Sequence, residues 1–289
     1  MESLPKGWRS ARFLTSLVVS LTLVSAAPNA TGVSNEKELL AAFKESFAAP
    51  DPGARAAALT TLGNASRLLP DKGTGKRVAQ ALVKGLEDRE LEVAAAAVAQ
   101  LCSGRDVDTV IGALDPYLRD LHKQLEQRVG NPDDTVRSFV DRATVAFENG
   151  CRALANYKDD RVAALFVPLL AGLPADTKKR DLGSRLVGVL ATAALEQGTE
   201  AAAEAAVNQT KTFSLPAQAA GARKLHDALS GFANKNEMTP PEWSDAYSEQ
   251  WFAWLSANRN KLPKKLGRLA APPTNEPSHP QNGQPGKSG

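Results

Sequence analysis

Three stretches decide the predicted fold: AAPDPGARAAAL at residues 48–59, LEDRELEVAAAA at residues 86–97 and GNPDDTVR at residues 130–137. Each stretch carries an aspartate in a short break: Asp51, Asp88 and the pair Asp133-Asp134. A small or β-branched residue comes next, often followed by an arginine, and an alanine-rich or apolar helical run then begins. An aspartate before such a run is a preferred helix N-cap, because its carboxylate accepts hydrogen bonds from the first free backbone N–H groups. We therefore expect each stretch to be a tight turn between two helices.

The same pattern of helices separated by short breaks extends outward from these turns over residues 35–266. Aromatic residues make up only 6% of the chain, and no segment alternates β-branched and aromatic residues as a strand does. Apolar residues instead recur at the spacing of a helix face. The sequence predicts an all-α chain with helices at 35–47, 53–68, 76–87, 90–103, 106–128 (with a kink at Pro116), 131–157, 159–173, 176–197, 199–210, 215–235 and 242–262.

The turns resemble those of the HEAT-like (armadillo-type) helical repeat family, in which an acidic residue caps the second helix and a Val-Arg pair follows. Their spacing is 37 residues from Asp51 to Asp88 and 46 from Asp88 to Asp134, close to the repeat length of about 40–47. Only Val136-Arg137 matches the Val-Arg pair fully. The resemblance implies an α-solenoid of about four to five units of paired antiparallel helices, whose exposed surface binds proteins or peptides. An irregular helical bundle is the alternative interpretation.

The N-terminal segment has the pattern of an export signal. Basic residues precede an apolar run, residues 13–24. Either Val24-Ser25-Ala26 or Ser25-Ala26-Ala27 then gives the small-residue pattern at which signal peptidase cleaves. The run is about a dozen residues long, whereas a bilayer-spanning helix needs roughly 20. We expect a signal peptide over 1–27, a flexible leader over 28–35 and a periplasmic or secreted protein without a membrane span after cleavage. An uncleaved N-terminal anchor is the alternative.

The charge of the chain argues against nucleic-acid binding. The formal net charge is +3, but residues 1–26 contain three basic residues and one acidic residue, so the chain without its signal is close to neutral. Tight phosphate binding needs clustered positive charge.

Residues 36–266 are expected to be the helical repeat domain. Residues 267–289 are rich in Pro, Gly, Asn and Gln and are expected to be disordered, because they offer little apolar surface to bury.

The sequence shows no catalytic or metal-binding pattern. The three histidines, His122, His226 and His279, have no cysteine, carboxylate or second histidine at metal-ligand spacing, so we interpret them as surface residues without a role. We predict neither enzyme activity nor a cofactor.

Cys102 and Cys151 lie late in helices of adjacent units. They are either a disulfide pair, which an oxidising compartment permits, or two buried free thiols.

The last expected helix carries an aromatic row: Trp243, Tyr247, Trp251 and Trp254 are spaced by four, four and three residues and share one helix face. Two interpretations follow. The helix is a cap that closes the end of the repeat array with bulky side chains, or its aromatic face is a contact site for a partner, since such residues dominate protein interfaces.

The sequence therefore predicts an exported, non-catalytic protein-interaction or scaffold module with a protein partner that it does not identify. Two alternatives stay open. One is an accessory domain that holds a substrate for a periplasmic enzyme. The other is a helical enzyme whose site is dispersed along the chain.

Overall fold

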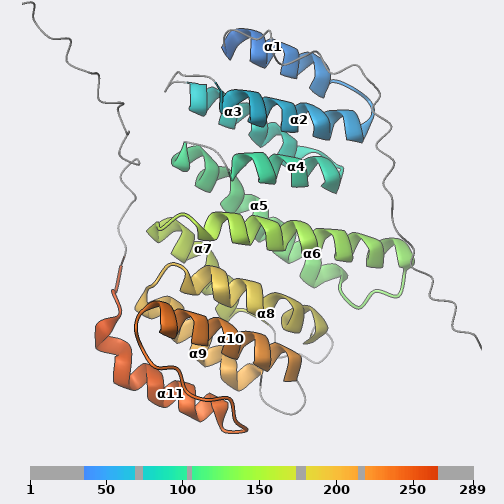
Figure 1. Ribbon diagram of the computed structural model, residues 1–289. Coiled ribbons are helices and arrows are strands. Elements are labelled where there is room, and N and C mark those ends of the chain that lie inside the picture. The colour runs from blue at the N-terminus through green and yellow to red at the C-terminus, as the bar shows by residue number, and fades with distance from the viewer. Residues whose placement is uncertain (1–35, 69–73, 103–105, 174–179, 214–218, 266–289) are drawn as a thin grey trace, which may run out of the picture. The chain divides into compact units, whose positions relative to one another are not determined.

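The regular structure of this chain is helical throughout the part described by the computed structural model, residues 36–68, 74–102, 106–173, 180–213 and 219–265 (Figure 1). The all-α prediction is confirmed. The α-helices are α1 (Glu36–Phe47), α2 (Pro52–Ser66), α3 (Thr74–Val83), α4 (Leu91–Leu101), α5 (Val107–Arg128), α6 (Asp134–Ala155), α7 (Asp160–Ala171), α8 (Arg180–Leu195), α9 (Glu200–Thr212), α10 (Ala219–Lys235) and α11 (Tyr247–Asn258). Two short 3₁₀ helices, η2 (Lys84–Glu87) and η3 (Arg259–Lys261), extend α3 and α11.

The turn aspartates act as the sequence predicts, with one variation. Asp51 accepts a hydrogen bond from the backbone N–H of Ala54 at 2.7 Å, and Asp133 accepts one from that of Thr135 at 2.8 Å, so both cap the following helix. Asp88 instead accepts the N–H of Glu90 and binds the Arg55 guanidinium at 2.7 and 2.9 Å. The first and second turns are thus joined by an ion pair.

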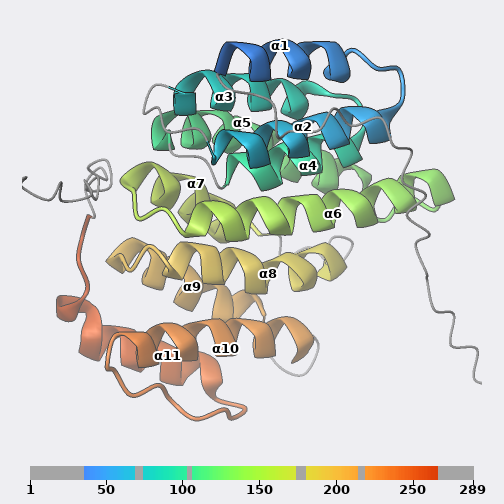
Figure 2. The same cartoon turned by 45° about the horizontal axis from the view of Figure 1, so that its top comes forward.

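The helices pack in two rows. The even-numbered helices α2, α4, α6, α8 and α10 each contact the next member of their row, and so do the odd-numbered helices from α1 to α11 (Figures 1 and 2). Consecutive helices such as α5 and α6, or α7 and α8, also pack against each other. The core between the rows is built from buried leucines, alanines and phenylalanines such as Leu59, Phe147 and Phe166, which are fully buried. These side chains belong to one continuous apolar cluster.

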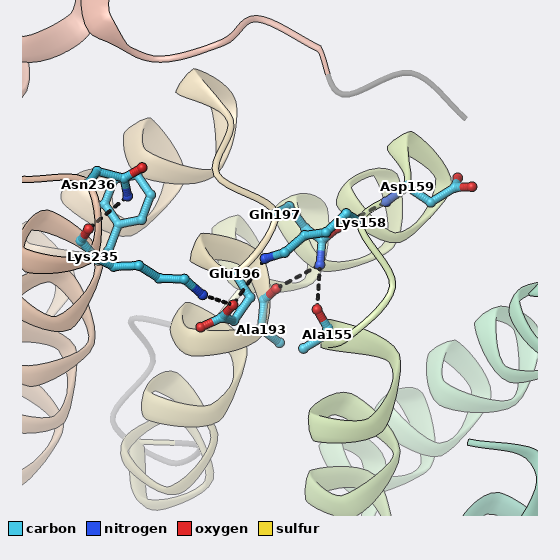
Figure 3. A network of polar contacts seen from close by, with 9 residues as sticks. Ala155, Lys158, Asp159, Ala193, Glu196, Gln197, Lys235 and Asn236 are labelled. Carbon is cyan, nitrogen blue, oxygen red and sulfur yellow. Dashed lines mark hydrogen bonds and ion pairs between the residues drawn. The ribbon is translucent and has the colours of Figure 1, made fainter. Parts of the chain in front are cut away.

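A polar network joins three successive helix pairs at the C-terminal ends of α6, α8 and α10 (Figure 3). Glu196, just after α8, accepts hydrogen bonds from Lys158 at 3.0 Å and from Lys235 at 2.6 Å. Burial alone would raise the pKa of Glu196, but the hydrogen bonds from Lys235 and Lys158 outweigh it and hold the pKa below its usual value. One carboxylate thus links the loop after α6 to the last residue of α10.

Gln197 forms the buried part of the same network (Figure 3). Its side chain is 1% exposed, donates to the carbonyl of Ala155 at 3.2 Å and accepts from the backbone N–H of Asp159 at 3.4 Å. It therefore completes the hydrogen bonding of backbone groups where α6 ends and α7 begins.

The last helix is shorter at its start than the sequence predicts. The expected helix covers residues 242–262, whereas α11 begins at Tyr247. Ser244 accounts for the difference: its hydroxyl accepts the N–H of Ala246, and its carbonyl accepts the N–H of Tyr247. These bonds form a turn that precedes the helix.

Three further predictions concern segments outside the described residues: the signal peptide over 1–27, the leader over 28–35 and the disordered tail over 267–289. Within the described part of the chain, no helix is both long and apolar enough to cross a membrane.

The hydrogen bonds of Gln197 to the backbone of Ala155 and Asp159 generate a prediction about stability. The variant Gln197→Leu leaves a buried carbonyl and a buried N–H without their partner, so we expect the free energy of unfolding to fall by about 1–3 kcal/mol. The neighbouring variant Glu196→Gln removes only partly exposed ion pairs and should cost about 1 kcal/mol or less. Urea unfolding followed by circular dichroism measures both. A larger decrease in the free energy of unfolding for Glu196→Gln than for Gln197→Leu would contradict the role assigned to Gln197.

Candidate functional site

The aromatic row of the C-terminal segment faces the protein interior. Tyr247, Trp251 and Trp254 are 1%, 0% and 7% exposed, and only Trp243 is half-buried. Each of the three buried side chains uses its polar atom inside the protein. Such placement does not support the prediction that these three side chains contact a partner.

The polar contacts of the row hold α11 against its neighbours. The Trp251 indole N–H donates to His226 Nδ1 at 3.1 Å, and the Trp254 indole N–H donates to the carbonyl of Thr239 at 3.0 Å. The Tyr247 hydroxyl lies against the carbonyls of Thr210, at 3.0 Å, and Phe213. These bonds tie α11 to α9, to α10 and to the segment after α10.

Two histidines occupy buried positions, which corrects the prediction that the histidines are surface residues. His122 and His226 are 6% and 7% exposed, because they lie on the core-facing sides of α5 and α10. His226 stands edge-on to Trp243 and Trp251, with ring centroids 5.1 and 5.7 Å apart. His279 lies outside the described residues.

Both cysteines are free thiols in the structure, but only one of them is buried as the free-thiol alternative expects. Cys151 is fully buried and Cys102 is half-buried. Burial raises the pKa of Cys102 to about 12 and that of Cys151 well above its usual value. The thiolate is the reactive form of cysteine, so neither thiol is poised for nucleophilic chemistry.

The candidate site is a groove of about 660 Å³ across the exposed faces of three successive even-numbered helices, α6, α8 and α10. Its lining combines small side chains with charged ones. The lining residues are Glu148, Arg152, Ala155, Asn156, Arg185, Gly188, Val189, Thr192, Ala193, Glu196, Lys224, Asp227 and Ala228.

One face of α8 lies in the middle of the groove, and Gly188 on that face leaves space in it. Along α8, Arg185, Gly188, Thr192 and Glu196 follow one another at intervals of three, four and four residues, so they share one face. Gly188 faces α10, because an added Cβ would stand 3.0 Å from Lys224 Cβ. A side chain at residue 188 would therefore fill the groove or push α10 away.

Most charged groups of the groove have an ion-pair partner. Arg152 binds Glu148 at 3.2 Å on the same helix, and Arg185 binds Asp141 of α6 at 2.9 Å. Glu196, at the far end, belongs to the polar network of Figure 3. Lys224 donates to the carbonyl of Ser184 at 3.2 Å, and no carboxylate of the described residues is within ion-pair distance of it.

The polar side chains that line the groove are carboxylates, arginines, a lysine, an asparagine and a threonine. In the ranges that the structure describes, no group of three or more His, Cys, Asp or Glu side chains is placed to hold a metal ion. What the lining offers is hydrogen bonding, charge and shape.

The groove residues were not predicted from the sequence. A signal for them was present in the small and polar stripe on α8, because residues three and four positions apart share a helix face. That stripe alone does not reveal that α6 and α10 flank it, since this depends on how the helix pairs stack.

Comparison with known proteins adds little to this description. Neither the scan against protein-family models nor the search of curated proteins finds a match. Among solved structures, the chain is similar to the crystal structure of an engineered protein, at 14% sequence identity over 79% of this chain and 98% of that chain. The TM-score is 0.33, and a likeness this distant carries no argument about fold or function.

His226 generates a prediction about pH. The Trp251 indole N–H can only donate, so Nδ1 of His226 must be unprotonated in this arrangement. Burial lowers the pKa of His226; the nearby Arg223 lowers it further, and Asp227 opposes both. As the pH falls below about 6.5, the unfolded chain binds the proton before the folded chain does, so the free energy of unfolding decreases.

The variant His226→Asn serves as the comparison, because an amide oxygen accepts a hydrogen bond but does not titrate in this range. Thermal or urea unfolding at a series of pH values should show a smaller loss of stability on acidification in the variant than in the original protein. An identical loss in both proteins would contradict the assigned role of His226.

Proposed function

We propose that this protein is an α-solenoid of HEAT-like helix pairs that acts as a non-catalytic protein-interaction or scaffold module. The two rows of helices support the solenoid, because each helix contacts the next in its row. Side-chain contacts that recur at offsets near one repeat length support it further: Arg185 to Asp141 spans 44 residues, Gln197 to Ala155 spans 42, and Lys235 to Glu196 spans 39. In this proposal α11 is the capping helix, and its inward aromatic row closes the end of the array.

One observation carries the interaction function: a groove that extends over three consecutive helices of one row. Stacked helical repeats use such multi-helix surfaces to bind extended partners. We therefore place the partner-binding site on α6, α8 and α10 and not on the aromatic row.

A substrate-holding accessory domain is the second candidate. The groove volume of about 660 Å³ favours it, because small-molecule sites span roughly 300–1,000 Å³. This candidate predicts that the groove retains a small molecule and no peptide.

A library of displayed linear peptides, panned on the immobilised full-length protein, tests the interaction function. Thr192→Trp places a bulky side chain in the groove and should weaken the selected peptides at least about tenfold, since peptide and indole compete for the same space. Thr60→Trp is the matched control. Thr60 is also exposed and bonds the carbonyl four residues before it, as Thr192 does, but it lies on α2 outside the lining.

Peptides that bind the original protein and Thr60→Trp equally, but not Thr192→Trp, support the proposal. Peptides that bind Thr192→Trp as well as the original protein would place recognition elsewhere and contradict it.

We also propose that the protein is exported, on the strength of the basic segment, apolar run and small residues of 1–27. Mass spectrometry of the protein recovered outside the cytoplasm should find Ala27 or Pro28 as the first residue. An intact N-terminal segment on that protein would contradict cleavage and favour the anchor alternative.

A further inference from the structure

His226 of α10 lies where the C-terminal segment meets the rest of the protein. Its ring stands edge-on to Trp243 and Trp251, and its Nδ1 atom accepts the indole N–H of Trp251 at 3.1 Å. On its other side, Nε2 lies 3.3 Å from the Ser230 hydroxyl. Because an indole N–H can only donate, Nδ1 is unprotonated and Nε2 carries the proton of the neutral ring. A second proton can therefore be added only at the atom that holds Trp251.

A protonated His226 does not fit this arrangement. The new N–H at Nδ1 would point at the Trp251 indole N–H, so two donors would face each other without an acceptor. The His226 side chain is also buried, and a charge placed there loses most of its hydration. The hydrogen bond that holds α11 at Trp251 thus exists only while His226 is neutral.

The charged side chains that act on His226 belong to its own helix. Burial lowers the pKa of His226, Arg223 lowers it further and Asp227 raises it. Arg223 and Asp227 also pair with each other at 3.1 Å. The C-terminal segment faces the ring with Trp243 and Trp251, neither of which carries a charge. Among the described residues, no carboxylate of α8, α9 or α11 is within ion-pair distance of His226.

The position of α11 allows it to detach without opening the other helices. It is the last α-helix of the described chain and packs mainly on α9, whereas α10 packs on both α8 and α9. The Trp254 indole N–H donates to the carbonyl of Thr239 at 3.0 Å, so α11 is fastened to the segment that precedes it, residues 239–246. Glu237, two residues after α10, has a φ of 57°, the left-handed conformation that commonly ends a helix. Residues 239–246 therefore do not continue α10.

The far end of α11 is held by contacts that do not involve His226. Arg259 pairs with Glu200 and with Glu204, the latter at 2.8 Å. The carbonyl of Pro263 accepts the backbone N–H of Glu200 at 2.9 Å. These contacts tether the end of α11 to α9 when the contacts of Trp251 are lost, so that α11 can return to its place.

We propose that residues 239–262 form an acid-released latch: a proton on His226 Nδ1 breaks its bond with Trp251 and lets α11 leave α10 while the other helices stay folded. Release exposes the aromatic row of Tyr247, Trp251 and Trp254, which the closed latch buries. The proposal depends on the contacts of this segment and not on the proposed interaction function, so either can fail without the other.

Proton linkage sets the size of the effect. In the released state His226 is solvated and has the ordinary histidine pKa of about 6.5, whereas in the closed state its pKa is lower. The released state therefore binds the proton more strongly. Each pH unit below about 6.5 favours release by up to about tenfold, until the closed state also binds the proton.

Hydrogen–deuterium exchange of the full-length protein, followed by mass spectrometry between about pH 7.5 and pH 5.5, tests the proposal. Protection factors, corrected for the intrinsic effect of pH on exchange, should be at least about tenfold lower in α11 than in α5 and α6. Those of α11 should fall by up to about tenfold from about pH 6.5 to pH 5.5. Equal protection of α11, α5 and α6 at every pH would show that α11 opens only with the whole protein and would overturn the proposal. Protection of α11 that does not change with pH would also overturn it.

Two variants assign the effect to His226. His226→Asn keeps an acceptor for Trp251 but does not titrate, so the protection of α11 should change by less than about twofold over the same pH range. His122→Asn is the matched control, because His122 is the other buried histidine of the described chain and lies on α5. It should keep the full pH effect on α11, which a whole-protein opening would not. The same pH effect in His226→Asn as in the original protein would overturn the proposal. If His226→Asn does not fold, the original protein and His122→Asn still decide between local release and whole-protein opening.

Discussion

Among the described residues, no helix pair encloses a core of its own, and the rest of the structure depends on that constraint. The buried side chains of α2, such as Leu59, belong to the same apolar cluster as those of α6 and α8, such as Phe147 and Leu190. An amphipathic helix pair leaves an apolar face uncovered until the next pair stacks on it. Where neighbouring pairs stack, backbone groups at the ends of their helices are buried and need hydrogen-bond partners. Gln197 supplies those partners between the end of α6 and the start of α7.

The groove is a consequence of the same stacking. Because α6, α8 and α10 lie next to one another in one row, the exposed faces of the three helices form a continuous strip. The absence of a side chain at Gly188 leaves room for Lys224 of α10, and the ion pairs of Glu196 with Lys158 and Lys235 link the helices at the other end of the strip. A surface that is held this firmly needs little rearrangement to bind a partner, which reduces the entropic cost of binding.

Local sequence patterns predicted the helices well, because their causes are local. The carboxylates of Asp51 and Asp133 cap the helices that follow them, and the predicted and observed helix limits differ by only a few residues at most ends. The environment of each helix face was not predictable in the same way. Periodicity placed Trp251 and Trp254 on one face, but only the packing of α11 on its neighbours shows that this face is covered. His226 was misjudged for the same reason, since its role depends on Trp251, which lies 25 residues away in the sequence.

The central claim is that the exposed face of α6, α8 and α10 is the recognition surface. Photo-cross-linking tests it most directly: a bound peptide carries a photoreactive phenylalanine analogue, and the adducts are mapped on the protein by mass spectrometry. The account predicts adducts on residues 148–156, 185–196 and 224–228, which line the groove. Adducts concentrated on α11 or on the odd-numbered helices would contradict it.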